Sequence, residues 1–360
     1  MTLPGGNLAD AAEHELRLPE IDGERCVYAD FEHASCQACV DACPSQAWIL
    51  SDDSLGLDTQ ACNGCGLCVP ACPPGALHIE FPWVIRHFGG KALALFACER
   101  SDVNGTSGIM PCIHALGTRQ LMVLHTAGIT NLLVSEGNCQ DCVLLDRNET
   151  LAQRIEQLNR LLTQRNLVPI KLLSYSNTVW QKIYRQEEVI SKGTLLKRRA
   201  FLGGATPVQN LQQQLVVLDP LNRSECQTIP PGSLLPEPEV EHDYLWPWAP
   251  QLDPLKCNAC NACIQLCPTG ALELQYQDTE SEYLIQAKYC TGCNICTDVC
   301  TQDAILPTAW DTVSLQTIPL VEKQCTSCGN PFHLPADNPM TDESRCPVCS
   351  NRDQLLFRQQ

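Results

Sequence analysis

The spacing of the cysteines constrains this chain more than any other feature of its sequence. Three runs follow the pattern C-x2-C-x2-C-x3-C, and they are Cys62-Cys65-Cys68-Cys72, Cys257-Cys260-Cys263-Cys267 and Cys290-Cys293-Cys296-Cys300. A fourth run ends in the same way, with Cys36, Cys39 and Cys43, but nine residues separate Cys36 from its first cysteine, Cys26. Three thiolates spaced by two residues hold one face of a [4Fe–4S] cubane, and the fourth ligates the other cluster of a pair. The pattern therefore predicts four cubane clusters.

The residues that follow each run repeat as well. The continuations are Cys43-Pro-Ser-Gln-Ala, Cys72-Pro-Pro-Gly-Ala, Cys267-Pro-Thr-Gly-Ala and Cys300-Thr-Gln-Asp-Ala. One unit is thus used four times, as two pairs. Each pair resembles the bacterial two-cluster ferredoxin, over residues 25–82 and 254–308.

That resemblance implies crossed ligation, in which the last cysteine of one run completes the site of the other. In the first pair, the predicted ligands are the Cys26 set (Cys26, Cys36, Cys39 and Cys72) and the Cys62 set (Cys62, Cys65, Cys68 and Cys43). In the second pair, they are the Cys257 set (Cys257, Cys260, Cys263 and Cys300) and the Cys290 set (Cys290, Cys293, Cys296 and Cys267). Cys26 is the least regular of these ligands because of the longer loop behind it.

The composition agrees with metal ligation and disfavours several other functions. Cysteine makes up 25 of the 360 residues, in a chain too long to depend on disulfide staples. The formal net charge of −17 disfavours nucleic-acid and anionic-membrane partners. No G-x-G-x-x-G follows an expected strand and no Walker A sequence occurs, so no nucleotide site is expected. Without a run of about 18 apolar residues or a signal-peptide core, we expect no membrane insertion and a reducing, cytoplasmic location.

Between the two ferredoxin-like segments, the hydrophobic pattern predicts a small parallel α/β domain. Apolar strands are expected at 91–97, 130–136 and 168–173, and an amphipathic helix at 151–162. Four cysteines of this segment fall just after strands or just before helices. Ligands collect at the carboxyl edge of such sheets. We therefore expect one shared site for the central set (Cys98, Cys112, Cys139 and Cys142).

Residues 91–175 also resemble the small iron–sulfur (delta) subunit of methyl-viologen-reducing hydrogenase. The matching residues are Phe96-Ala97-Cys98, Met110-Pro111-Cys112 and the segment from Leu133 to Cys142. The resemblance implies a [2Fe–2S] cluster on the central set. The family usually has further cysteines where this chain has Glu99-Arg100-Ser101, so a docking domain without a cluster is the alternative.

The last cysteines form two C-x2-C knuckles. They make up the terminal set (Cys325, Cys328, Cys346 and Cys349). Two such knuckles typically form a tetrahedral site of four thiolates, and this segment resembles a zinc ribbon. Rubredoxin uses similar knuckles for iron, and sulfur ligands alone do not separate the metals. Zinc is expected and iron is the alternative, while Cys226 is assigned no role.

The sequence therefore predicts an α+β multidomain protein. The expected parts are a polar tail (1–24), a dicluster ferredoxin-like module (25–88), an α/β domain like the hydrogenase delta subunit (89–178), a basic segment and proline-rich linker (179–253), a second dicluster ferredoxin-like module (254–315) and a zinc ribbon (320–360).

The predicted function is electron transfer by a non-catalytic subunit. The metal-site cysteines are committed to closed four-thiolate sites, the histidines show no metal spacing, and no catalytic residue is expected. The hydrogenase resemblance implies a partner redox enzyme or electron carrier, such as a hydrogenase, a heterodisulfide-reductase-like complex or a molybdenum formate dehydrogenase. The alternative is an iron–sulfur scaffold or accessory protein that serves the assembly or regulation of such an enzyme.

Overall fold

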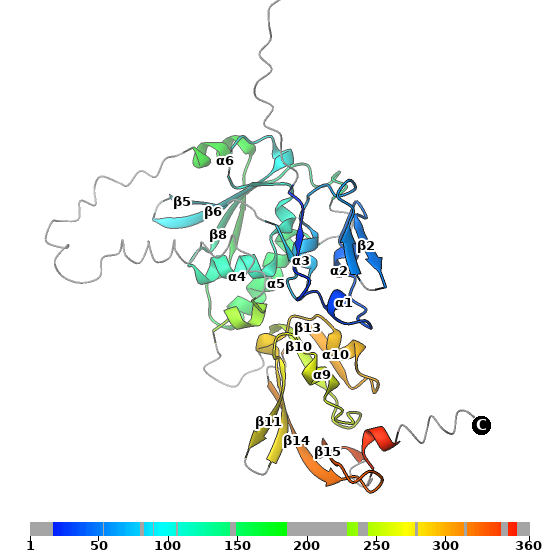
Figure 1. The fold of residues 1–360 in the computed structure, drawn as a ribbon. Coiled ribbons are helices and arrows are strands. Elements are labelled where there is room, and N and C mark those ends of the chain that lie inside the picture. The colour runs from blue at the N-terminus through cyan, green and yellow to red at the C-terminus, as the bar shows by residue number, and fades with distance from the viewer. Residues whose placement is uncertain are drawn as a thin grey trace, which may run out of the picture.

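The computed structural model describes residues 17–52, 54–79, 83–88, 90–105, 107–144, 149–185, 229–236, 244–277, 280–312, 315–339 and 345–350 (Figure 1). The expected polar tail and the basic segment with its linker lie largely outside these ranges, and Cys226 lies wholly outside them. Within the described ranges, the helices are too short or too polar to cross a bilayer.

The first cysteine-rich module consists of short helices and two small antiparallel strand pairs. Its helices are α1 (Val27–Asp30), α2 (Ala38–Asp41) and α3 (Cys68–Ala71), and its strands are β1 (Glu20–Ile21), β2 (Trp48–Ser51), β3 (Ser54–Leu57) and β4 (Leu77–His78). β2 pairs with β3, and β1 pairs with β4. Each helix adjoins or contains a cysteine, because Cys26 precedes α1, Cys39 lies in α2 and Cys68 begins α3.

The middle domain contains a sheet in the order β5-β6-β8-β9, with β7 beside β6. The strands are β5 (Val84–Phe88), β6 (Lys91–Cys98), β7 (Ile109–Met110), β8 (Asn131–Ser135) and β9 (Lys171–Ser174). β6, β8 and β9 are parallel, in agreement with the hydrophobic pattern. β5 is not expected from the hydrophobic pattern, and it is antiparallel to β6. Only residues 89 and 90 separate these two strands, and so short a connection joins only antiparallel strands.

Helices cover both faces of this sheet. α4 (Thr118–Thr126) and α5 (Leu151–Gln164) pack on the face that carries Phe96, whereas α6 (Asn177–Tyr184) packs Trp180 on the face that carries Leu95. The expected apolar stripe of α5 is buried in the core, and the N-cap Thr150 accepts a hydrogen bond from the Gln153 amide at 3.2 Å. Alternate residues of β6 therefore supply two separate apolar layers.

The second cysteine-rich module shares one sheet with the terminal segment (residues 320–350). Its strands are β11 (Leu272–Gln277), β12 (Glu280–Gln286), β14 (Leu315–Gln324) and β15 (Pro331–Pro335), all antiparallel to their neighbours. The helices α9 (Ala262–Gln265) and α10 (Ile295–Asp298) carry cysteines of the two runs. β14 crosses the boundary expected between a separate dicluster module and a separate ribbon. The terminal segment is therefore an extension of the second module.

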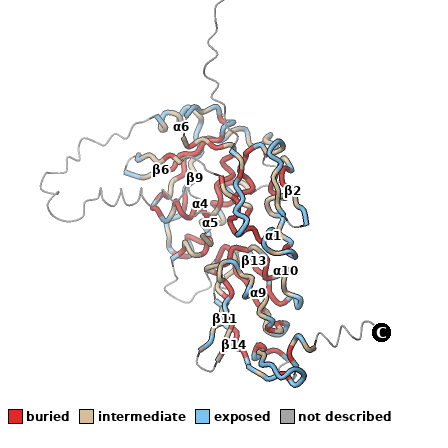
Figure 2. Tube along the Cα trace, in the orientation of Figure 1, coloured by how far each residue is buried: buried red, intermediate tan, exposed pale blue. Residues whose placement is uncertain are grey.

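The structure corrects the expected extent of the linker. Residues 246–252 form β10 (Trp246–Leu252), which pairs with β13 (Ile305–Asp311). β10 tolerates its prolines because β13 is its only partner strand among the described residues, so the amides of its other edge need no strand partner. Trp246 and Ala249 pack into the core shared by the first module and the middle domain. β10 thus joins the second module to the first module and the middle domain. Buried segments lie on both sides of this contact (Figure 2).

Candidate iron–sulfur and metal centres

The four cysteines of the Cys26 set lie together. Burial is the main reason that the pKa of the Cys39 thiol rises to about 12, and the neighbouring thiols that raise it further are Cys72, Cys36 and Cys26. The nine-residue insertion does not displace Cys26, which is the N-cap of α1 and is buried. The insertion folds through α1 and then returns to Cys36, so the longer loop is compatible with the irregular spacing.

The Cys62 set lies beside the Cys26 set. Burial raises the pKa of the Cys68 thiol above its usual range, and the neighbouring thiols that add to this shift are Cys65, Cys39, Cys43 and Cys62. Three of these belong to the Cys62 set, and Cys39 belongs to the Cys26 set. The Cys43 thiol also adds to the raised pKa of the Cys65 thiol, so Cys43 lies beside two cysteines of the Cys62 run, which is compatible with crossed ligation.

The second module repeats this arrangement. Burial raises the pKa of the Cys263 thiol to about 12, with further contributions from Cys257, Cys260 and Cys300. Burial likewise raises the pKa of the Cys296 thiol above its usual range, with further contributions from Cys290, Cys293, Cys263 and Cys267. Cys263 and Cys296 thus link the two sets, as Cys39 and Cys68 do in the first module.

These thiol sets fit the binding of iron–sulfur clusters. Buried neighbouring thiolates repel one another and lack solvation, which is why the pKa values rise. A cationic metal core reverses this balance, because coordinating thiols are deprotonated by the metal. Crossed sets of four thiols, with the spacing of each run, match the donor set of two cubanes per module.

The structure gives a physical reason for the repeated continuation after each run. The third residue after the last cysteine has a positive φ in all four cases, at Gln46 (53°), Gly75 (74°), Gly270 (67°) and Asp303 (48°). Glycine adopts this conformation most readily. The turn directs the next amide back to sulfur, and Ala47, Ala76 and Ala304 donate to the Sγ of Cys43, Cys72 and Cys300 at 3.3, 3.2 and 3.3 Å. The repeat is visible in the sequence, but these N–H···S bonds are seen only in the structure.

The central set also lies together, at the carboxyl edge of the parallel strands. Cys98 ends β6, Cys112 follows β7, and Cys139 and Cys142 follow β8. Burial raises the pKa of the Cys112 thiol to about 12, and the neighbouring thiols that add to it are Cys98, Cys65 and Cys142. The Arg100 guanidinium donates to the Cys142 Sγ at 3.4 Å. The donor set is suitable for a cluster, and it adjoins the Cys62 set through Cys65.

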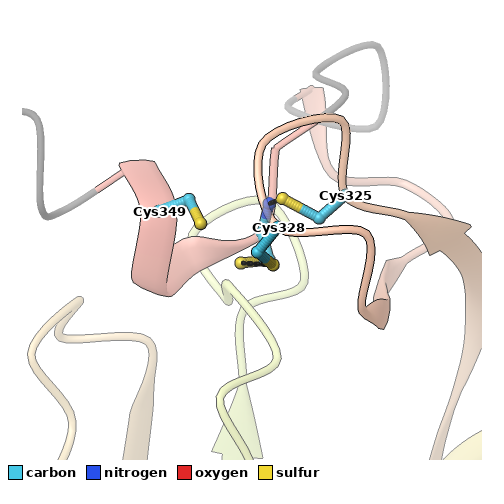
Figure 3. Close-up of side chains that lie close together, drawn as sticks. Cys325, Cys328 and Cys349 are labelled. Atoms are coloured by element: carbon cyan, nitrogen blue, oxygen red, sulfur yellow. Dashed lines mark hydrogen bonds between the residues drawn. The ribbon is translucent and has the colours of Figure 1, made fainter.

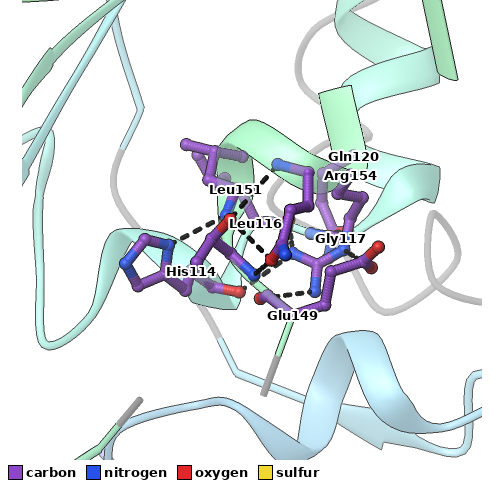
Figure 4. Close-up of polar contacts among 9 residues, drawn as sticks. His114, Leu116, Gly117, Gln120, Glu149, Leu151 and Arg154 are labelled. Atoms are coloured by element: carbon purple, nitrogen blue, oxygen red, sulfur yellow. Dashed lines mark hydrogen bonds and ion pairs between the residues drawn. The ribbon is translucent and has the colours of Figure 1, made fainter. Parts of the chain in front are cut away.

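A polar network fixes the chain just after Cys112 (Figure 4). The Leu151 amide donates to His114 Nδ1 at 2.9 Å, and the buried Arg154 donates to the carbonyl oxygens of His114 and Leu116 at 3.0 and 2.7 Å. The Glu149 carboxylate pairs with Arg154 at 3.4 Å. The network attaches residues 114–116 to the start of α5 and thereby positions Cys112. No sequence motif marks it.

The terminal set is suited to a single metal ion (Figure 3). The four Sγ atoms all lie within 4.8 Å of one another, and those of Cys328 and Cys346 are 3.9 Å apart. Tetrahedral zinc with Zn–S bonds of about 2.3 Å requires sulfur atoms about 3.8 Å apart. The Cys346 amide donates to the Cys325 Sγ at 3.2 Å, and this bond is the main cause that lowers the pKa of the Cys325 thiol to about 6. The bond therefore favours a thiolate at Cys325, whereas hydrogen bonds with the thiols of Cys346 and Cys328 raise the pKa of the Cys349 thiol to about 12.

Two side chains of the terminal segment hold the loop of the Cys257 set. His333 Nε2 lies 3.0 Å from Asn261 Oδ1 and 3.2 Å from the hydroxyl of Tyr283, which itself donates to Asn261. Asn338 donates its side-chain amide to the Cys257 carbonyl oxygen at 2.7 Å. No spacing rule links His333 to the Cys257 loop, which lies more than 70 residues earlier along the chain.

Comparison with known proteins confirms the two ferredoxin domains. The 4Fe-4S dicluster domain matches residues 34–77 and again 256–304. A putative oxidoreductase of Escherichia coli, UacF, is 30% identical over 103 residues, which are 29% of this chain and 14% of that protein. An uncharacterised ferredoxin of Methanocaldococcus jannaschii is 32% identical over 74 residues, 21% of this chain and 47% of the relative. The ferredoxin-type protein NapF of E. coli is 33% identical over 64 residues, 16% and 38%.

The chain spans less than half the length of each of these three relatives. The fold and the matched domains define an iron–sulfur protein with two dicluster ferredoxin domains and a four-cysteine group near its C-terminus. The domains support four [4Fe–4S] clusters and a role in electron transfer. The matched domain models leave the middle domain unassigned, so its resemblance to a hydrogenase subunit stays a prediction.

Proposed function

We propose that this chain is a multi-cluster electron relay without a substrate site of its own. The observation that carries the proposal is the side-by-side placement of the thiol sets, linked by Cys39 and Cys68 in one module and by Cys263 and Cys296 in the other. When bound, each cubane exchanges one electron at a potential set by its surroundings. The chain holds the thiolates and donates amides to sulfur.

We also propose a [2Fe–2S] cluster on the central set and zinc on the terminal set. The four central thiols stand at the carboxyl edge of the sheet, and Arg100 supplies a positive charge beside Cys142. For the terminal set, the short spacing of the sulfur atoms supports one tetrahedral ion rather than a cluster.

The partner that we propose is an oxidoreductase or its electron carrier. A hydrogenase, a heterodisulfide-reductase-like complex and a formate dehydrogenase are the classes implied by the resemblance of the middle domain. The formal charge of −17 favours a basic docking face on the partner. Binding should therefore weaken as the salt concentration rises.

Anaerobic reduction of the reconstituted full chain tests the relay. Dithionite should reduce all the cubanes rapidly, and oxidised methyl viologen should then reoxidise them reversibly. The chain alone should show no turnover with hydrogen, formate or nicotinamide nucleotides. Clusters that resist reduction would indicate a scaffold instead, and steady-state turnover that survives removal of contaminating enzymes would show a catalytic site.

A further inference from the structure

The two halves of the chain meet at a junction between the Cys26 set and the Cys290 set. The Ser35 amide and hydroxyl both donate to the Asp298 carboxylate, at 2.8 and 2.7 Å. Ser35 directly precedes Cys36, and Asp298 lies in α10 between Cys296 and Cys300. Ser35 therefore stands next to the Cys26 set, and Asp298 stands next to the Cys290 set. The two hydrogen bonds join the surroundings of these sets.

A cavity and a buried arginine also lie where these parts of the chain meet. A cavity of about 470 Å³ lies where the first module, the middle domain and the second module meet, and its lining includes Cys72, Arg119 and Trp248. Arg119 is buried and donates to the carbonyl oxygens of Cys72 and Ile229, at 3.2 and 2.9 Å.

A second junction joins the central set to the Cys62 set. Cys112 and Cys65 are both buried in one small apolar cluster with Leu67 and Leu144. The central set thus adjoins the Cys62 set, which shares the first module with the Cys26 set. The Ser35–Asp298 junction joins the Cys26 set to the Cys290 set. The Cys290 set shares the second module with the Cys257 set. Among the described residues, the five thiol sets therefore form a line. Each end set has one neighbouring set, and each inner set has two.

We infer that the five sets form one continuous path, in the order central, Cys62, Cys26, Cys290 and Cys257, and that Ser35 and Asp298 hold the crossing between the two halves. This inference rests on the proposed relay function. At each crossing, one electron leaves a reduced cluster, which is oxidised, and enters an oxidised neighbour, which is reduced; no bond changes and no proton moves. A one-electron donor supplies the path and a one-electron acceptor drains it.

The test compares Asp298→Ala, which removes both bonds, with Ser35→Ala, which removes only the hydroxyl bond. Glu273→Ala is the matched control, because Glu273 is an exposed acid of the same module on β11. Hydrogen exchange of the full chain measures the Ser35 amide, and electron paramagnetic resonance of the dithionite-reduced protein measures magnetic coupling between neighbouring clusters. Coupling within each module remains in every variant and serves as the internal reference.

In Asp298→Ala, the Ser35 amide should exchange about tenfold faster, since it loses a bond to a charged acceptor. The cross-junction part of the coupling should be lost, whereas iron content and reducibility stay at the wild-type level. Ser35→Ala should give a smaller change of the same kind, and Glu273→Ala should match the wild type. Faster exchange at Ser35 with unchanged coupling would overturn the inference. Failure of the wild-type clusters to accept electrons would instead refute the relay itself.

Discussion

Replacing Asn338 with alanine should loosen the loop that carries Cys257. The Asn338 side chain is 2% exposed. Its amide nitrogen donates to the carbonyl oxygens of Cys257, Pro254 and Leu255 at 2.7, 3.2 and 3.4 Å. Alanine cannot donate, and the site is too buried for bulk water to take over. A buried acceptor left without its partner costs about 1–3 kcal/mol.

Hydrogen exchange of the full chain is the suitable assay because the effect is local. The amides of Lys256 and Cys257 donate to the Asp253 carbonyl oxygen at 3.2 and 3.1 Å, so both are protected in the folded loop. A loss of about 2 kcal/mol in the free energy of local opening makes exchange about 30-fold faster, since each 1.36 kcal/mol is a factor of ten. The peptide that spans residues 253–257 reports this change.

Asn330→Ala is the matched control in the same segment. Asn330 is exposed, and its backbone oxygen, which the substitution keeps, accepts from the Cys325 amide at 2.9 Å. Asn338→Asp should loosen the loop more than alanine does, because it sets a buried carboxylate against carbonyl oxygens. If Asn338→Ala exchanges within about threefold of the wild type while the terminal set keeps its metal, the terminal segment does not hold this loop.

Further predictions concern the metal sites and the core. Reconstituted protein should contain about eighteen iron atoms and one zinc, from four cubanes, one [2Fe–2S] cluster and the terminal set; elemental analysis near sixteen iron would remove the central cluster, and near nineteen without zinc would assign iron to the terminal set. Cys139→Ser or Cys142→Ser should abolish the [2Fe–2S] Mössbauer signal and keep the cubanes, with Cys226→Ser as the control; retention of that signal would contradict the site. Chelation of the terminal metal should accelerate exchange around His333, since β15 leads from one knuckle to the other; unchanged exchange would make the metal dispensable for the fold. Leu158→Ala, at a fully buried position of α5, should lower the free energy of unfolding by about 2–5 kcal/mol in urea titrations, and a loss below about 1 kcal/mol would contradict the packing of α5.

Much of the site was predictable because most ligands of a cluster are cysteines separated by only two or three residues in the sequence. Cysteines three positions apart reach one cluster, and the cysteine four positions further along ligates the other cluster of the pair, so the runs identify their own chemistry. The grouping of Cys43 with the Cys62 run and of Cys300 with the Cys257 run follows from the same rule. In the structure, Cys43 and Cys300 lie beside those runs. The repeated alanine also reflects local geometry, because a turn of four residues returns its amide to sulfur.

The sequence by itself determined the thiol sets, the parallel strands of the middle domain and the pairing of the two terminal knuckles, since each depends on contacts or periodicities within a short stretch of chain. Only the tertiary structure decided that 246–252 would be a strand, that β14 would join the second module to the terminal segment, and that Ser35 would meet Asp298. These features join residues far apart in sequence. They depend on which surfaces pack best once the modules have formed, and no local pattern records that competition.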